Sequence, residues 1–194
     1  MKCLKIEALL GKKTIIIGPL NSGKTLLLAE IVKKLTQKGL KDEILILDFA
    51  PPRMGKIGGK LSDYIILNKL LYFYPEKVYA PRYEGKSREE VIKLAEENRR
   101  LLERYLDNAA KINRKILIIN DITLYLHRGK LEKVLKLMKS KETVIITAYC
   151  GDEFNDKGSN INLREKAMVG ELMEYVDIII KTPVNRENEA AKKV

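Results

Sequence analysis

Five short runs of apolar, mostly β-branched residues recur along the chain, and segments with helical spacing separate them. The runs are Thr14–Ile17, Ile44–Leu47, Ile116–Ile119, Thr143–Ile146 and Ile178–Ile180. Each run is almost continuously apolar, which is typical of a strand buried on both faces of a parallel sheet. Strands of this kind that alternate with helices predict an α/β fold, a three-layer sandwich with a mostly parallel sheet of five strands or slightly more.

Apolar stripes and end signals predict the helices between these runs. The predicted helices cover Thr25–Lys38, Ser87–Ile112, Leu131–Lys139 and Leu163–Tyr175. Gly39 is a suitable C-terminal stop for the first helix, and Ser87 with Glu90 has the spacing of a capping box for the second. Residues 2–10 are expected to add a short strand before the first core strand.

Two stretches do not fit the alternation of strands and helices. Residues 49–86 are rich in aromatic residues and glycine, and we expect them to form an inserted connection in which Leu61–Leu71 is a helix. Residues 151–162 are polar and are expected to be a mobile loop. The tail, residues 184–194, is polar and expected to be loose. Without an internal repeat, residues 1–194 are predicted to form a single nucleotide-binding domain.

Composition excludes several classes of protein. Hydrophobic residues make up 45% of the 194 residues, which is enough for a packed core. The longest apolar run, Leu70–Tyr74, is far shorter than the roughly 20 residues of a membrane-spanning helix, so no membrane association is expected. Lys5 and Glu7 interrupt the N-terminal apolar residues, which argues against a signal peptide. Cys3 and Cys150 are too few for a disulfide framework or a four-thiolate zinc site, so a cytoplasmic location is expected.

A formal net charge of +11 favours contact with nucleic acid, an acidic surface or an anionic small molecule. The alternative is a thermophilic surface rich in lysine, since Lys, Glu and Ile are all abundant. The lysines of Lys130–Lys141 lie on a predicted amphipathic helix, so this segment alone does not indicate a nucleic-acid site.

The segment Gly18–Thr25 reads GPLNSGKT and matches the pattern G-x-x-x-x-G-K-[ST] between a predicted strand and a predicted helix. Glycines at both ends permit a turn whose amides surround a phosphate, and the helix N-terminus adds partial positive charge. Lys24 supplies a full charge, and the Thr25 hydroxyl is a ligand for Mg²⁺. The predicted binding residues are Gly18, Pro19, Leu20, Asn21, Ser22, Gly23, Lys24, Thr25 and Leu26.

This segment resembles the P-loop NTPase superfamily, which implies a nucleoside triphosphate with Mg²⁺. The second signature of that superfamily, an apolar strand ending in Asp, resembles Ile116–Asp121 (ILIIND). The resemblance implies that Thr25 and Asp121 hold the metal, although Asp121 also suits a turn or helix cap. The guanine-specific Asn/Thr-Lys-x-Asp motif does not occur, so ATP is favoured over GTP.

Within the superfamily, the chain is most similar to the RecA-like branch. The opening GPLNSGKTLLL is also similar to ABC-type ATPases, but their Leu-Ser-Gly-Gly signature is missing. The RecA-like branch implies a polar sensor on a strand between the phosphate-loop strand and the Asp strand, and Thr147 is the candidate. Many such ATPases have Glu after the Asp, where this chain has Ile122. Asp48, at the end of the second strand, is the candidate substitute, its alternative being a turn or cap residue.

Three functions remain open at this point. The first is an Mg²⁺-dependent ATPase with Lys24, Asp48 and Asp121 as catalytic residues, and the second is a kinase with its acceptor held by residues 49–86. The third is a nucleotide-dependent nucleic-acid-binding module, and a homo-oligomer is possible in each case. His127, the only histidine, is expected at a helix end or in a loop. Candidate arginine fingers are Arg82, Arg88, Arg99, Arg100, Arg104, Arg128 and Arg164.

Overall fold

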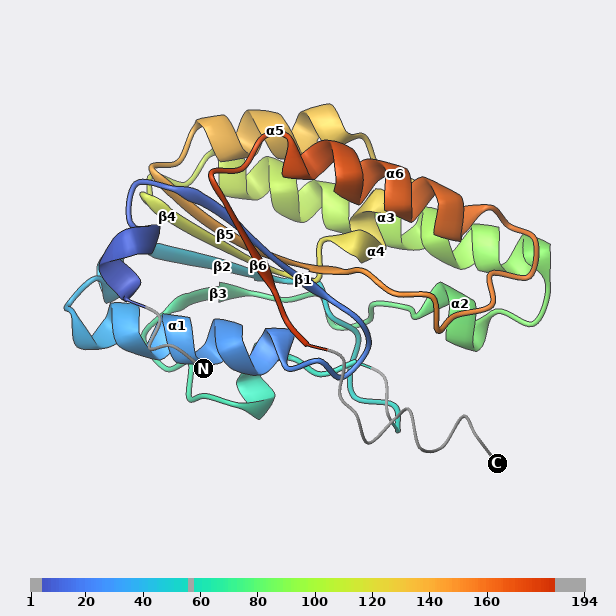
Figure 1. The fold of residues 1–194 in the computed structure, drawn as a ribbon, viewed down its shortest axis with the longest axis horizontal. Coiled ribbons are helices and arrows are strands. Elements are labelled where there is room, and N and C mark those ends of the chain that lie inside the picture. The colour runs from blue at the N-terminus through green and yellow to red at the C-terminus, as the bar shows by residue number, and fades with distance from the viewer. Residues whose placement is uncertain (1–4, 56–57, 184–194) are drawn as a thin grey trace.

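The computed structural model describes residues 5–55 and 58–183, which build one six-stranded sheet (Figure 1). The strands are β1 (Lys13–Gly18), β2 (Ile44–Asp48), β3 (Leu71–Phe73), β4 (Ile116–Asn120), β5 (Thr143–Tyr149) and β6 (Ile178–Lys181). Their spatial order is β3-β2-β4-β5-β1-β6, and every pair in the described residues is parallel. The predicted α/β fold is confirmed, with all five predicted strands and one more.

Helices cover both faces of this sheet. They are α1 (Lys24–Gln37), α2 (Pro81–Glu84), α3 (Arg88–Ala110), α4 (Thr123–Leu126), α5 (Leu131–Lys139) and α6 (Ile161–Met173), with short 3₁₀ helices at Ile6–Leu9, Lys41–Glu43 and Leu61–Asp63. Figure 1 shows α1 on one face of the sheet and α3, α5 and α6 on the other. At the start of α3 the Ser87 hydroxyl accepts a hydrogen bond from the Glu90 amide, as predicted. The Glu90 carboxylate, however, accepts a hydrogen bond from the backbone amide of Lys86, one residue before the expected Ser87.

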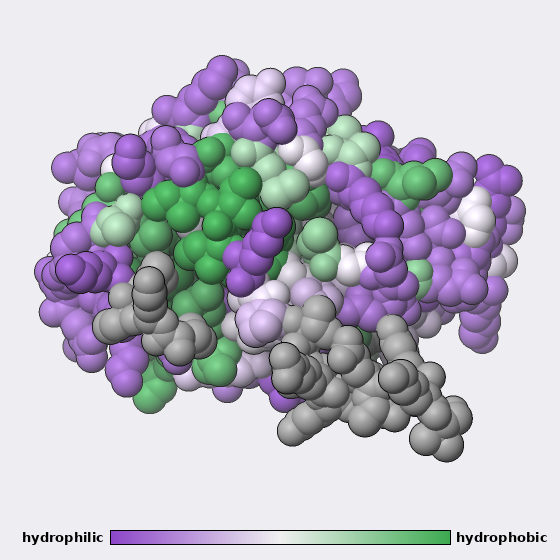
Figure 2. Space-filling view, viewed as in Figure 1, coloured by the Kyte–Doolittle hydropathy of each residue, from purple (hydrophilic) through white to green (hydrophobic). Residues whose placement is uncertain are grey.

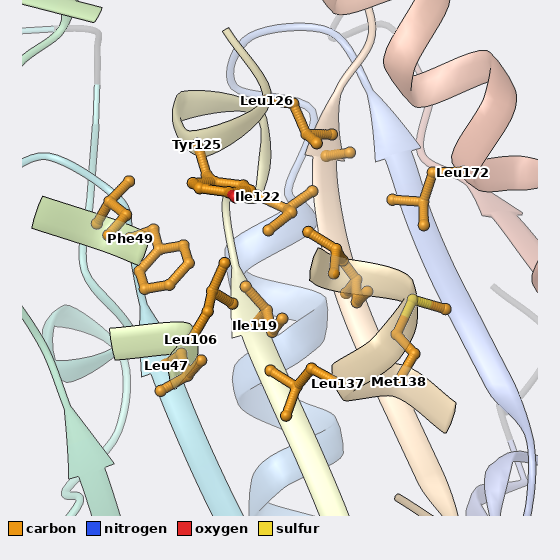
Figure 3. Packing of buried hydrophobic residues seen from close by; sticks show 14 of the residues in the cluster. Leu47, Phe49, Leu106, Ile119, Ile122, Tyr125, Leu126, Leu137, Met138 and Leu172 are labelled. Atoms are coloured by element: carbon orange, nitrogen blue, oxygen red, sulfur yellow. The ribbon is translucent and has the colours of Figure 1, made fainter. Parts of the chain in front are cut away.

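Alternate residues of each central strand belong to two different cores. Ile119 of β4 and Leu47 of β2 pack toward α3, α5 and α6, whereas their neighbours Ile118 and Ile46 pack toward α1. Figure 3 shows the first of these cores in the region where Leu106, Leu137 and Met138 meet the sheet. Both faces of the sheet are therefore buried, which explains why polar and apolar residues do not alternate along the strands.

Two predictions for segments outside the five core strands are wrong. Leu61–Leu71 is not a helix: only Leu61–Asp63 forms a 3₁₀ turn, Lys69 has a positive φ of 70°, and β3 begins at Leu71. The exposed edge of β2 offers a hydrogen-bonding partner to the β-prone sequence Leu71–Phe73, and this pairing overrides the helical spacing. Within residues 2–10, Ile6–Leu9 is a 3₁₀ helix instead of a strand, because its three-residue spacing buries Ile6 and Leu9 together over α1.

The strand β6 closes one edge of the sheet. Figure 2 shows hydrophobic side chains gathered on the front face where β6 and β1 lie in Figure 1, and Ile179 is 45% exposed there. None of the helices in residues 5–55 and 58–183 has the length and apolar character needed to cross a bilayer.

The substitution Ile118→Ala tests the buried centre of the sheet. Ile118 has no exposed surface, so removing its side-chain atoms leaves a cavity under α1 and should lower the free energy of unfolding by about 2–5 kcal/mol. The matched control is Ile66→Ala at a residue that is 83% exposed, for which the change should stay within about 0.5 kcal/mol. Urea unfolding of the three proteins gives both values, and equal losses for the two variants would contradict the packing described here.

Candidate functional site

The turn between β1 and α1 is shaped for close approach of a ligand to its backbone. Gly23 caps α1 with a φ of 86°, a conformation that side chains rarely adopt. At Gly18 a Cβ atom would lie 2.1 Å from the Thr182 hydroxyl oxygen, so the end of β1 tolerates only glycine beside the chain that follows β6. Residues 19–23 therefore turn at the carboxyl edge of the sheet directly before the N-terminus of a 14-residue helix.

The Lys24 ammonium group lies inside this turn. Its Nζ donates hydrogen bonds to the carbonyl oxygens of Gly18, at 2.8 Å, and Pro19, at 2.6 Å. Burial lowers the pKa of Lys24, and the negative charge of Asp121 opposes that effect. Its other contacts are the Ser22 hydroxyl at 3.4 Å and the ring of Tyr149. The groups that the Lys24 ammonium contacts directly in the turn are thus neutral, and an anion placed there would gain a charged donor.

Asn120, the last residue of β4, joins the other side chains at this edge. Its Oδ1 accepts hydrogen bonds from the hydroxyls of Thr147, at 3.1 Å, and Thr25, at 3.4 Å, while its Nδ2 donates to Asp48 Oδ1 at 2.8 Å. Asn120 was not among the predicted site residues, although its position directly before Asp121 at the end of an apolar strand was a usable signal. The sheet order places Thr147 on β5, between β1 and β4, as expected.

Asp121 lies one residue beyond the strand and has a positive φ of 60°. Its amide donates to the Thr147 hydroxyl at 2.8 Å, and its carboxylate accepts a hydrogen bond from the Thr123 hydroxyl. Burial raises the pKa of Asp121, against the Thr123 hydrogen bond and the charge of Lys24. The two predicted metal ligands therefore have different hydrogen-bond partners: Thr25 bonds to Asn120, and Asp121 bonds to Thr123. Ile122 is fully buried, so it presents no group to a ligand.

Asp48 is completely buried and accepts four hydrogen bonds. Its donors are the amides of Ala50 and Leu61, the Tyr72 hydroxyl and the Asn120 amide group. Burial raises the pKa of Asp48, and these donors oppose that effect. The carboxylate ties the long connection after β2 to the end of the sheet, and it is absent from the lining of the neighbouring cavity.

A cavity of about 890 Å³, including the space open to solvent, extends from the turn along the carboxyl edge of the sheet. Its lining includes residues 20–26 of the predicted phosphate loop, three groups at the strand ends and three side chains from the long connection. These further residues are Asn120, Asp121, Thr147, Tyr64, Arg82 and Tyr83. Arg82 is the only one of the candidate arginine fingers in this lining.

Arg82, Glu165 and His127 form a buried cluster, of which Arg82 and His127 line the cavity. The Arg82 guanidinium holds both oxygens of Glu165 at 2.8 Å, and Glu165 also lies 2.8 Å from His127 Nε2. The same guanidinium stacks on the rings of Tyr149 and Phe154. Eighty-three residues separate Arg82 from Glu165, so no local sequence pattern pointed to this cluster.

The segment after β5 contacts the turn directly. Glu153 Oε1 accepts a hydrogen bond from the amide of Leu20 at 3.1 Å, and the Tyr149 hydroxyl holds the other carboxylate oxygen. A carboxylate of the protein therefore uses one of the amides that the turn offers to an anion.

Comparison with known proteins shows the class of fold. No protein-family model matches the sequence, and no curated protein matches it. The structure is similar to the flagellar accessory protein FlaH from Methanocaldococcus jannaschii, with a TM-score of 0.52, 12% identity, and coverage of 89% of this chain and 71% of that one. The Pif1 helicase from Candida albicans matches with a TM-score of 0.42, 14% identity, and coverage of 96% of this chain and 41% of that one. The chain has the P-loop NTPase fold, because it has a parallel sheet with flanking helices and its structure is similar to that of FlaH.

The substitution Asp48→Asn tests whether this carboxylate organises the site. An amide group placed among four donors leaves at least one of them without an acceptor, so the free energy of unfolding should fall by about 1–3 kcal/mol. The control Tyr72→Phe removes a single donor and should cost about 1 kcal/mol. Chemical denaturation measures both, and an Asp48→Asn protein as stable as its parent would contradict the structural role.

Proposed function

We propose that the chain binds ATP with Mg²⁺ on Gly18–Thr25 and hydrolyses it, and that loop rearrangement is the output. The observation that carries this proposal is the position of the Lys24 ammonium group, inside a glycine-flanked turn at a helix N-terminus. The turn amides and Lys24 would hold the β- and γ-phosphates. The rest of the nucleotide would lie in the cavity beside the turn, which opens to solvent.

The oxygen donors beside the turn fit a magnesium ion that is shared with phosphate groups. Within the described residues, no group of three or more His, Cys, Asp and Glu side chains is placed to hold a metal alone. Mg²⁺ in nucleotide sites usually keeps several waters and takes few protein ligands. Thr25 would supply its hydroxyl, and Asp121 and Asn120 would supply oxygens through bound water. When bound, the metal would neutralise charge that develops on the phosphates.

Several residues of the chain then act by position and charge. Lys24 stabilises negative charge on the terminal phosphate, because its ammonium group is already held, partly buried, beside the turn. Thr147 links Asn120 to the backbone of Asp121, so it transmits a shift at either residue to β5. Asp48, which the sequence suggested as a catalytic residue, acts in this proposal by positioning Asn120.

Replacing Lys24 by Ala should remove turnover and weaken ATP binding by roughly 10–100-fold, the value of one charge-assisted hydrogen bond to phosphate. Lys33→Ala is a matched control, since Lys33 is exposed on the same helix. Calorimetric titration with ATP–Mg²⁺ and release of free phosphate provide the two measurements. Unchanged ATP affinity in the Lys24→Ala protein, with the fold intact by circular dichroism, would contradict the proposed site.

Replacing Glu153 by Gln should strengthen ATP binding by roughly 3–10-fold, because a negative charge beside the phosphate-binding amides is removed. The control Asp152→Asn removes an equal charge from a neighbour that pairs with Lys166 on the surface. The same titrations compare the variants. If the two substitutions change the affinity equally, the Glu153 contact with the turn has no specific effect on the nucleotide.

Transfer of the terminal phosphate to an acceptor is the second candidate function. Tyr64 and Tyr83, from the long connection, line the cavity and remain partly exposed, so an acceptor could stack on them. A nucleic-acid strand is one such acceptor, for which the net charge of +11 is favourable. Incubation with labelled ATP and panels of nucleosides, nucleotides and 5′-hydroxyl RNA separates the candidates, since hydrolysis gives free phosphate alone.

A further inference from the structure

His127 occupies an unusual position for the only histidine of the chain. It follows α4 as its C-terminal cap, it has no exposed surface, and it lines the cavity that begins at the phosphate-binding turn. Its Nε2 lies 2.8 Å from Glu165, whereas its Nδ1 is buried without a hydrogen-bond partner in the described residues. A buried ring nitrogen without a partner is costly unless a ligand or water supplies one.

The partners of Glu165 determine which ring nitrogen carries the proton. Arg82 donates to both oxygens of Glu165 at 2.8 Å. Burial alone would raise the pKa of Glu165, but the hydrogen bond to His127 and the charge of Arg82 outweigh it, so the pKa of Glu165 is lowered. An ionised carboxylate only accepts hydrogen bonds, so Nε2 must be the donor. In the neutral ring, Nδ1 then carries a lone pair.

Several contacts hold the carboxylate that orients the ring. Glu165 is held by both terminal nitrogens of Arg82, and Arg82 is held in turn by Asn162 and by the rings of Tyr149 and Phe154. The backbone amide of His127 donates to the carbonyl oxygen of Thr123. A general-base histidine is oriented in the same way, with one ring nitrogen on a carboxylate and the other without a protein partner.

We propose that His127 is the catalytic base of this cavity, and that its Nδ1 accepts the proton of the water that attacks the terminal phosphate of bound ATP. Glu165 and Arg82 are positioning residues that hold the ring in the required tautomer. This inference rests on the proposed ATPase function. His127 would take the place of the glutamate that many RecA-like ATPases have directly after the Asp, since this chain has the buried Ile122 at that position.

The step balances without a further reactant. The water oxygen forms a bond to the γ-phosphorus, and the bond from that phosphorus to the bridging oxygen breaks. The electron pair of the broken bond remains on the oxygen of the departing β-phosphate. The proton of the water moves to Nδ1, and the imidazolium that forms is stabilised by the Glu165 carboxylate before it releases the proton to solvent.

The parent protein tests the tautomer directly, because a single histidine gives one set of imidazole signals. A ¹H–¹⁵N correlation spectrum of the ring at neutral pH should show a proton on Nε2 and none on Nδ1. A ring protonated on Nδ1 would overturn the proposal, and this result is independent of whether ATP binds.

The substitution His127→Gln tests the chemical step. The glutamine amide can replace the Nε2–H bond to Glu165, but it provides no basic nitrogen at the place of Nδ1. We expect kcat to fall roughly 10²–10⁴-fold, with ATP affinity unchanged within about threefold. A kcat within threefold of the parent would overturn the proposal for His127 alone. A parent that binds ATP without turnover would overturn both this proposal and the proposed hydrolysis, and a parent that binds no ATP would contradict the proposed site.

Chemical rescue separates a basic role from a packing role. In His127→Gly, added imidazole should restore turnover, whereas pyrazole, a ring of the same size that is far less basic, should not. Equal rescue by imidazole and pyrazole would assign the proton to another group. The same conclusion would follow if Asp121→Asn lost turnover while His127→Gln kept full turnover. Thermal unfolding shows whether each variant is folded. If a variant does not fold, the tautomer of His127 in the parent protein decides the proposal.

Discussion

The hydrogen bonds of Asn120 hold the candidate site together. This one side chain lies at the end of β4 and connects the hydroxyls of Thr25 and Thr147 to the carboxylate of Asp48. Those three residues belong to α1, β5 and β2, so the helix after the turn of residues 19–23 is coupled to two strands of the sheet. Because Asn120 is buried, any movement of Thr25 toward a metal ion must be accommodated by this network.

The charges of the cavity are arranged in pairs of opposite sign. Lys24 lies in the field of Asp121, and Arg82 is paired with Glu165 in a desolvated contact. Under the proposed function, a triphosphate would bring several negative charges, and Lys24 would exchange its neutral carbonyl partners for them. Arg82 is bound on both terminal nitrogens, which suits a positioning residue better than a mobile arginine finger.

Much of the fold could be predicted from the sequence, because strands buried on both faces have continuous apolar runs and helices have regular stripes. The prediction failed at Leu71–Phe73, where pairing with β2 overrides local spacing, and at Ile6–Leu9, which packs over α1. The turn of residues 19–23 between β1 and α1 could be predicted because its residues are contiguous. The cluster of Arg82, His127 and Glu165 was not, since tertiary packing alone brings these distant segments together. Asp48 was expected as a catalytic group from its place at a strand end, but its burial and four donors could not be deduced from the sequence.

The most direct test of this account is a crystal structure of the chain with Mg²⁺ and a non-hydrolysable ATP analogue. The account predicts the β-phosphate within the turn of residues 19–23, the Thr25 hydroxyl on the metal, and Lys24 Nζ moved from the carbonyl oxygens of Gly18 and Pro19 to phosphate oxygens. An analogue bound elsewhere, with Lys24 still on those two carbonyl oxygens, would contradict it.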